Sequence, residues 1–388
     1  MLSSQNKKVI VNLNELVLLV LSLTYAGISS NVFLGFRLVD LIILLVFILK
    51  LKRKIDPNIF VIFSLWLLSV AFSTVFGIIY NNPFVTSDLR FFTIYIFAAY
   101  IGYSIGTSAD FDVKRLFYKL IFFTLFIYTL IPFFDFLRFF YIPESFQKDE
   151  HLNTIFGPST IIINFLYIYL VLINKNRPIY FYLTYLIFAI IIYNFRISRT
   201  DLALMLLFFS WSIIYRFGER IKLKHILAAL AILIAGSIGF YINDSERIHG
   251  LFNPSQDSSF VYRILTNNEF LNQFSNSSVL IKTFGFGMGA TIDTYFNDWF
   301  GKITLTILDN GPLTVMMKTG YLGLLAFILS LYYPLKSLSF WWKIIVFFPL
   351  LLSLTLFSHV IYNLLYILGF YVICFKLKNQ RTKVSYKK

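Results

Sequence analysis

The stretch that decides the fold begins with NDSERIHGLF at Asn243 and ends with TILDN at Asn310. It is the one long polar stretch in a sequence that is otherwise almost continuously apolar, and long apolar runs lie on both sides of it. Apolar runs of such length are typical of membrane helices. This stretch, here called the polar interval, is therefore the only segment large enough to fold a small aqueous subdomain.

The composition excludes a soluble globular protein. Of the 388 residues, 58% are hydrophobic, 20% are aromatic and only 14% are charged, which leaves too few polar side chains for a water-facing surface. The formal net charge of +15 does not indicate nucleic-acid binding, because the basic residues occur in short clusters between apolar runs, as the positive-inside bias requires. The sequence predicts an all-α polytopic membrane protein.

About twelve spans of roughly 17 to 22 residues fit a hydrocarbon layer of about 30 Å. They are predicted at residues 10–28, 34–50, 58–80, 88–107, 115–134, 156–173, 178–195, 200–217, 224–241, 311–333, 342–358 and 360–376. The first span lacks a small-residue cleavage site, so we expect it to remain as an anchor.

The basic clusters orient these spans. Alternate connections are rich in Lys and Arg, which places both termini in the cytoplasm and the polar interval outside. The predicted organisation is residues 1–241 with transmembrane helices 1–9 and short loops, 242–310 as a large periplasmic loop, 311–376 with helices 10–12, and 377–388 as a basic cytoplasmic tail.

Arginines on the external side oppose the insertion bias and need another reason to be there. Arg196 and Arg199, between the seventh and eighth spans, share a face if that turn is helical. Two guanidiniums at the membrane surface suit a phosphate or diphosphate; snorkelling to the headgroups is the alternative. Arg263 stands in the polar interval, whose seven acidic and four basic residues give a net charge of −3. It is either half of a salt bridge or an anion ligand.

Two further arginines lie beside carboxylates. Arg90 follows Asp88 at the external start of the fourth span, and Arg37 lies near Asp40 in the second span. Charges at span ends are commonly paired with each other, so local pairing is expected for both.

The segment GFGMGA at residues 285–290 has three alternating glycines, which permit tight turns and close backbone approach. It does not open a helix after a strand, so it indicates neither a dinucleotide fingerprint nor a phosphate-binding loop. The four histidines show no ligand spacing, and the single Cys374 permits neither a disulfide nor a cysteine cluster. We expect no metal.

The order of several short motifs resembles that of the Wzy-type O-antigen and capsular polysaccharide polymerases, which are related to O-antigen ligases. The matching segments are SRTDLALML at 198–206, Arg263, GFGMG at 285–289 and LDNGPLTVMMKTGYLGLL at 308–325, with HLNTIFGPST at 151–160 as a looser match. The resemblance covers residues 198–325 by motif and the remainder of the chain by topology.

This resemblance implies glycosyl transfer at the periplasmic face of the bacterial inner membrane, from one undecaprenyl-diphosphate-linked glycan to a sugar hydroxyl of another. Such a donor carries its own leaving group, so no cofactor or metal is implied. Arg199 and Arg263, with Arg196 and Arg90 as further ligands, would bind the diphosphate, and Asp309 would be the candidate base. The implied partners are lipid-linked oligosaccharides, the bilayer and a chain-length-regulating co-polymerase, with no nucleic acid.

Asp309 is the position where the sequence departs from the related ligases, in which a histidine is expected. An exposed aspartate is a weak base at pH 7 unless desolvation raises its pKa, so Asp309 either deprotonates or only orients the acceptor hydroxyl. Capping of the tenth span is the alternative, because Gly311 and Pro312 follow. Glu269 and Asp293 are reserve candidates.

Two other functions stay open. The first is an O-antigen ligase or another membrane glycosyltransferase; a ligase would transfer the glycan to lipid A-core instead of to another repeat unit. A lipid-linked oligosaccharide flippase would place charges along a midplane cavity and would usually show repeat symmetry. No internal repeat is seen here, and the unusual charges gather at the external surface.

Overall fold

The computed structural model describes most of the chain, and it is mostly helical there. The described residues are 13–24, 31–33, 36–51, 55–108, 112–130, 157–174, 177–196, 199–217, 258–296, 301–305, 308, 310–340, 342–347 and 364–385. The predicted span at 224–241 and most of the predicted span at 342–358 lie outside these residues.

Within the described residues, three helices are long and apolar enough to cross a membrane, namely α3 (Pro57–Ile79), α4 (Val85–Thr107) and α15 (Gly311–Leu335). They coincide with the predicted spans at 58–80, 88–107 and 311–333. Helices also form at seven other predicted spans, whose crossing of a membrane stays a prediction. These are α1 (Leu13–Thr24), α2 (Leu38–Lys50), α5 (Val113–Leu130), α7 (Gly157–Ile173), α8 (Ile179–Arg196), α9 (Arg199–Phe217) and α18 (Leu364–Ser385).

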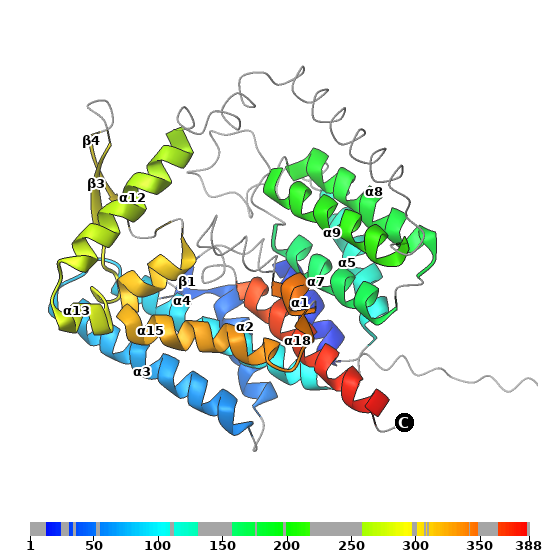
Figure 1. The fold of residues 1–388 in the computed structure, drawn as a ribbon, viewed down its shortest axis with the longest axis horizontal. Coiled ribbons are helices and arrows are strands. Elements are labelled where there is room, and N and C mark those ends of the chain that lie inside the picture. The colour runs from blue at the N-terminus through cyan, green and yellow to red at the C-terminus, as the bar shows by residue number, and fades with distance from the viewer. Residues whose placement is uncertain are drawn as a thin grey trace, which may run out of the picture.

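The polar interval contributes two helices and a hairpin. Helix α12 (Ser258–Ser275) leads into the short α13 (Val279–Phe284), and the strands β3 (Ile292–Phe296) and β4 (Gly301–Leu305) pair antiparallel. A second small antiparallel pair, β1 (Asn31–Phe33) with β2 (Phe36–Arg37), precedes α2. In Figure 1, α12, α13, β3 and β4 lie at one end of α3 and α15, and α8 and α9 lie on the other side of the molecule.

Local sequence sets both ends of α3. The Asp56 side chain caps the first turn by accepting from the Asn58 backbone N–H at 2.9 Å, and Pro57 follows the cap, where its fixed φ suits a first helical turn. At the other end Asn81 adopts a left-handed φ of 53°, and the Asn82 N–H donates to the Gly77 carbonyl at 2.9 Å. A left-handed residue at this position lets the following N–H groups donate to carbonyls that have no partner within the helix.

Helices α3 and α15 pack side by side in opposite directions (Figure 1). The Tyr333 hydroxyl near the end of α15 donates to Asp56 at the start of α3, at 2.8 Å. Burial raises the pKa of Asp56, but the hydrogen bonds from Tyr333 and Asn58 outweigh it and hold that pKa below its ordinary value. Asp56 is therefore ionised at neutral pH, which strengthens both bonds.

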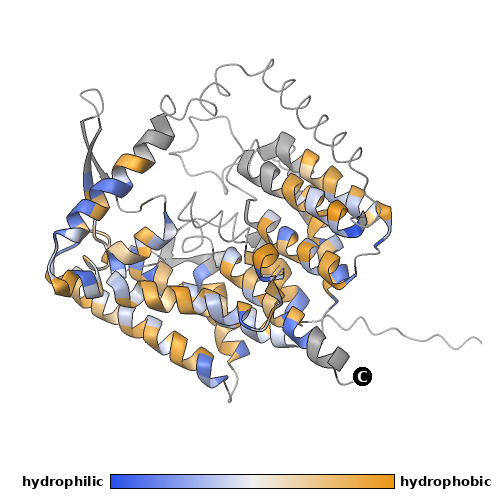
Figure 2. Ribbon diagram, in the orientation of Figure 1, coloured by the Kyte–Doolittle hydropathy of each residue, from blue (hydrophilic) through white to orange (hydrophobic). Residues whose placement is uncertain are grey.

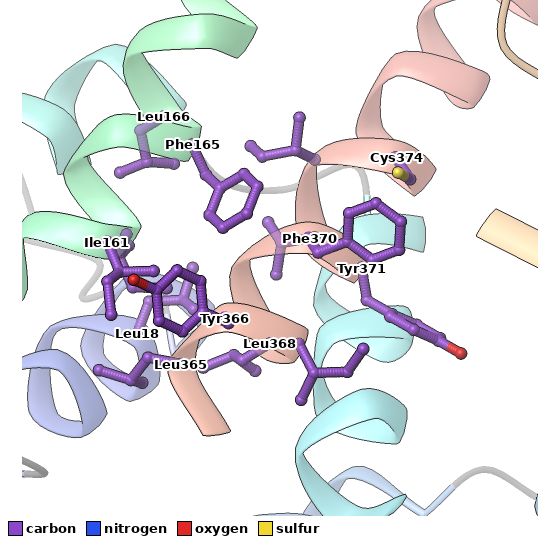
Figure 3. Packing of buried hydrophobic residues seen from close by; sticks show 14 of the residues in the cluster. Leu18, Ile161, Phe165, Leu166, Leu365, Tyr366, Leu368, Phe370, Tyr371 and Cys374 are labelled. Carbon is purple, nitrogen blue, oxygen red and sulfur yellow. The ribbon is translucent and has the colours of Figure 1, made fainter. Parts of the chain in front are cut away.

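Helix α18 packs against α4 and α7 to form the main core. Figure 3 shows Phe165 of α7 on the side that faces α18, and Leu18 of α1 beside Ile161 and Tyr366. Two glycines of α4 allow a close approach, because a Cβ at Gly102 or Gly106 would lie 2.7–2.8 Å from the Cβ of Tyr371 or Phe375. Small residues four apart are a common device for close packing of membrane helices.

Polar contacts gather where α4 ends. The Asn14 amide donates to the Ser108 hydroxyl at 2.9 Å, and the Lys376 ammonium donates to the Ser108 carbonyl. Lys119 forms an ion pair with Glu15 at 3.1 Å. Helix α18 continues through Ser385, so Lys378, Arg381 and Lys383 of the predicted basic tail lie on this helix.

Candidate functional site

The four main predicted site residues lie on or beside helices whose backbone is described, but their side chains lie outside the described residues. Arg196 ends α8, Arg199 begins α9 and Arg263 lies in α12. Asp309 itself is outside the described residues. Whether these groups meet around one diphosphate stays a prediction.

The alternative that Asp309 caps the next helix is wrong. The N-cap of α15 is Asn310, whose side chain accepts from the Leu313 backbone N–H at 3.1 Å. Leu308, the residue before Asp309, is hydrogen-bonded to the same turn. The Thr314 hydroxyl accepts from the Leu308 N–H at 3.1 Å and donates to the Leu308 carbonyl at 2.9 Å. The first turn of α15 therefore holds both Leu308 and Asn310.

The expected local pairing of Arg90 with Asp88 is also wrong. Arg90 is buried, lies 3.5 Å from the Asp40 carboxylate of α2 and stacks over the Phe91 ring at 4.3 Å. Periodicity explains the difference, since residues two apart on a helix do not face each other. Arg90 is thus buried beside the carboxylate of another helix, and its role as a diphosphate ligand stays a prediction.

Asp88 instead pairs with Lys318, which sequence reasoning missed. The Lys318 ammonium is fully buried and lies 2.7 Å from the Asp88 carboxylate, and it also donates to the Ala290 carbonyl. The same Asp88 oxygen accepts from the Gly289 backbone N–H at 2.7 Å. Asp88 of α4 and Lys318 of α15 thus neutralise each other's charge, and both side chains form hydrogen bonds with the backbone of the GFGMGA segment.

The GFGMGA segment, here called the glycine loop (residues 285–290), is seated between α3, α4 and α15. The Phe286 N–H donates to the Met317 carbonyl at 2.8 Å and the Met288 N–H donates to the Ser73 carbonyl at 2.9 Å. The Asn82 amide donates to the carbonyls of Phe286 and Met288 at 3.1 and 2.9 Å. The expected close backbone approach is confirmed.

The glycines make this contact possible. Gly287 has a φ of +93°, and a Cβ there would lie 2.5 Å from the Gly77 nitrogen of α3. Gly285 and Gly289 also have positive φ, and their Cβ atoms would meet backbone atoms of α15 and of the turn before α4. Any L side chain at these positions would be strained by both its own backbone and its neighbours.

Helix α15 is broken where the glycine loop meets it. Gly320 has φ 64° and ψ −161°, which interrupts the helix. The break releases carbonyls from the helical pattern, so Met317 accepts from Phe286 and Lys318 accepts from the Ser73 hydroxyl. A break of this kind inside a membrane helix is tolerated only where neighbouring groups satisfy the freed backbone.

The described part of the polar interval shares an apolar core with α15. Phe270 and Phe274 of α12, Ile292 of β3 and Met316 and Met317 of α15 are buried in one cluster with Leu308. Arg263 precedes Phe270 by seven residues, two helical turns, so its backbone position lies on the same side of α12 as this cluster. Helix α12 is consequently fixed to the N-terminal half of α15.

No protein-family model, curated protein sequence or solved structure matches this chain. The chemistry available to the site is therefore judged from its residues alone. Among the described residues, no group of three or more His, Cys, Asp or Glu side chains could hold a metal ion. Glu269, a reserve base, is half-buried on α12 and accepts from the Gln273 amide at 2.9 Å.

The signal that could have found Lys318 is simple. A lysine eight residues after Asn310 interrupts an apolar span in TVMMKTGYLGLL, and an ionisable residue inside a span is expected to be paired and to have a role. Its partner Asp88 lies 230 positions earlier in the chain, and no local pattern predicts such a contact.

Proposed function

We propose that this protein is a polymerase of bacterial O-antigen or capsular polysaccharide, a membrane glycosyltransferase that works without a metal. It transfers a growing glycan from undecaprenyl diphosphate to a sugar hydroxyl of another lipid-linked repeat unit. The reaction takes place at the periplasmic face of the inner membrane, and both chain termini are cytoplasmic.

The observation that supports the proposal is the docking of α12 on the N-terminal half of α15. Helix α12 carries Arg263, and Asp309 lies beside Asn310, which caps α15. A preorganised cation near a carboxylate suits glycosyl transfer from a diphosphate, because negative charge develops on the leaving group while the acceptor hydroxyl loses a proton. Arg199 and Arg196 complete the proposed diphosphate site from the α8–α9 junction.

The Asp88–Lys318 pair is evidence against the alternative that the protein is a flippase, that is, a carrier of lipid-linked oligosaccharides. A carrier would place its charges at the bilayer midplane around a substrate cavity. Lys318 lies only seven residues from the start of α15, or about 10 Å along the axis, and its ammonium is closed off by Asp88 and Ala290. This geometry favours a structural clamp near one end of the helix over a transport site.

The test is complementation of a strain that lacks this gene. Wild type, Arg199→Ala, Arg199→Lys, Arg263→Ala and Asp309→Ala are expressed at matched membrane levels, and glycan ladders are resolved on gels. Loss of one arginine is expected to remove about 3 to 4 kcal/mol of transition-state stabilisation, or two to three orders of magnitude in rate. Lysine at position 199 should restore little, because it lacks the fork of donors that a diphosphate accepts.

The exposed Arg115 in the first turn of α5 supplies the matched control, and Arg115→Ala should leave the ladder intact. Ladders from the Arg199 and Arg263 variants that equal wild type would refute the site. Single repeat units on the cytoplasmic face in the absence of the protein would identify a carrier. Loss of glycan from lipid A-core with polymer still present would identify a ligase.

A further inference from the structure

Helix α13 of the polar interval packs against the apolar helix α3. Phe284, the last residue of α13, packs against Phe72 and Phe76 of α3, with ring centroids 4.9 and 5.8 Å away. Phe72 lies seven residues before the end of α3, which corresponds to about 10 Å along the helix axis. The end of α13 therefore lies at the level of the last two turns of a helix that is long enough to span a bilayer.

The outer surface at this level is apolar. Val279 of α13 is 80% exposed and Leu280 is 49% exposed, and on α3 Val75 and Ile79 are 53% and 63% exposed. Helix α13 contacts both α3 and α15 (Figure 1). Figure 2 colours the adjoining part of α3 and much of α13 as hydrophobic, and Lys282 is the one charged residue of α13. The apolar surface of α13 thus continues the apolar surface of α3.

The glycine loop that follows α13 meets the condition for backbone at membrane depth. Non-helical backbone there must be buried in protein with its polar groups paired. Phe286, Met288 and Gly289 donate their N–H groups to Met317, Ser73 and Asp88. Gly285, Gly287, Met288, Gly289 and Ala290 are all buried.

We propose that residues 279–290 form a re-entrant segment whose outer face contacts lipid acyl chains. Helix α13 enters the outer leaflet beside α3, with Val279 and Leu280 against acyl chains near the headgroup boundary. The glycine loop then returns through the protein interior to β3. Acyl chains are the occupant that fits, because Val279 and Leu280, the exposed residues of the segment, are apolar and because α13 packs against α3, a candidate span whose exposed side chains at this end include Val75 and Ile79. The proposal is independent of the enzymatic activity proposed above.

The test is spin-label accessibility in lipid vesicles. In a Cys374→Ser background, single labels are attached at Val279→Cys and, as a second variant, at Leu280→Cys. Val75→Cys on the lipid-facing side of α3 is the reference for lipid, and the exposed Gln273→Cys on α12 is the reference for water. Apolar oxygen and a water-soluble nickel chelate are the two relaxing agents.

Labels at 279 and 280 should match the Val75 label. Their ratio of oxygen to nickel accessibility should exceed that of the Gln273 label by roughly tenfold, because polar solutes are excluded from hydrocarbon. A ratio equal to that of Gln273 at both positions would overturn the proposal by placing α13 in water. Low accessibility to both agents would also overturn it, by showing a protein partner on this surface.

Discussion

At the scale of single residues, the buried pair of Asp88 and Lys318 gives the clearest prediction. Removing one partner leaves an uncompensated charge in an apolar interior, which typically costs about 3–5 kcal/mol, whereas removing both is far milder. Asp88→Asn and Lys318→Met should each sharply lower the melting temperature of the detergent-solubilised protein. The double variant should melt above both, because an asparagine oxygen still accepts from the Gly289 N–H.

The control for this comparison is Lys336→Met, since Lys336 is exposed just beyond the other end of α15. This variant should have the same melting temperature as the wild type. A double variant no more stable than the single variants would show that the two charges do not act as a unit.

At the scale of elements, the break in α15 depends on Gly320. Its φ and ψ lie in a region that only glycine occupies readily, and a Cβ there would lie 2.4 Å from the backbone of Thr283. Gly320→Ala should therefore either displace α13 or straighten α15, at a cost of at least about 1–3 kcal/mol. The expected result is a lower melting temperature together with new proteolysis within residues 279–290.

Leu325→Ala is the comparison on the same helix, because Leu325 is exposed on the apolar surface of α15. It should change the melting temperature little. If Gly320→Ala behaves like Leu325→Ala, the break is not required for docking of the glycine loop.

The same element shows what sequence reasoning can and cannot reach. Apolar length predicted α3, α4 and α15 within a few residues, because a span is a local property of the chain. The glycines of the loop predicted close backbone approach but not against which helix. The pairings of Lys318 with Asp88 and of Arg90 with Asp40 join distant segments, and they depend on packing that no single stretch of sequence encodes.

At the scale of the whole molecule, the C-terminal helix α18 packs against α4 and α7, which lie in the N-terminal half of the chain. Helix α18 lies between α4 and α7, and the Asn379 amide donates to the carbonyls of Gly106 and Thr107 at 3.3 and 3.2 Å. The Tyr371 hydroxyl donates to the Ser330 carbonyl of α15 at 2.7 Å. Helix α18 thus holds α4 and α15 together along the same spans that meet the glycine loop at their other end.

This packing can be tested with the single cysteine of the chain. Cys374 is fully buried on α18, so N-ethylmaleimide should not label it in the folded protein, because thiol reactivity requires access. Gly106→Leu should expose it, since a Cβ at Gly106 would already lie 2.8 Å from the Phe375 Cβ and overpacking of this kind commonly costs about 1–3 kcal/mol. Ala71→Leu adds a similar volume at an exposed position of α3 and should leave Cys374 protected. Protection of Cys374 in Gly106→Leu would mean that α18 does not depend on the glycine face of α4.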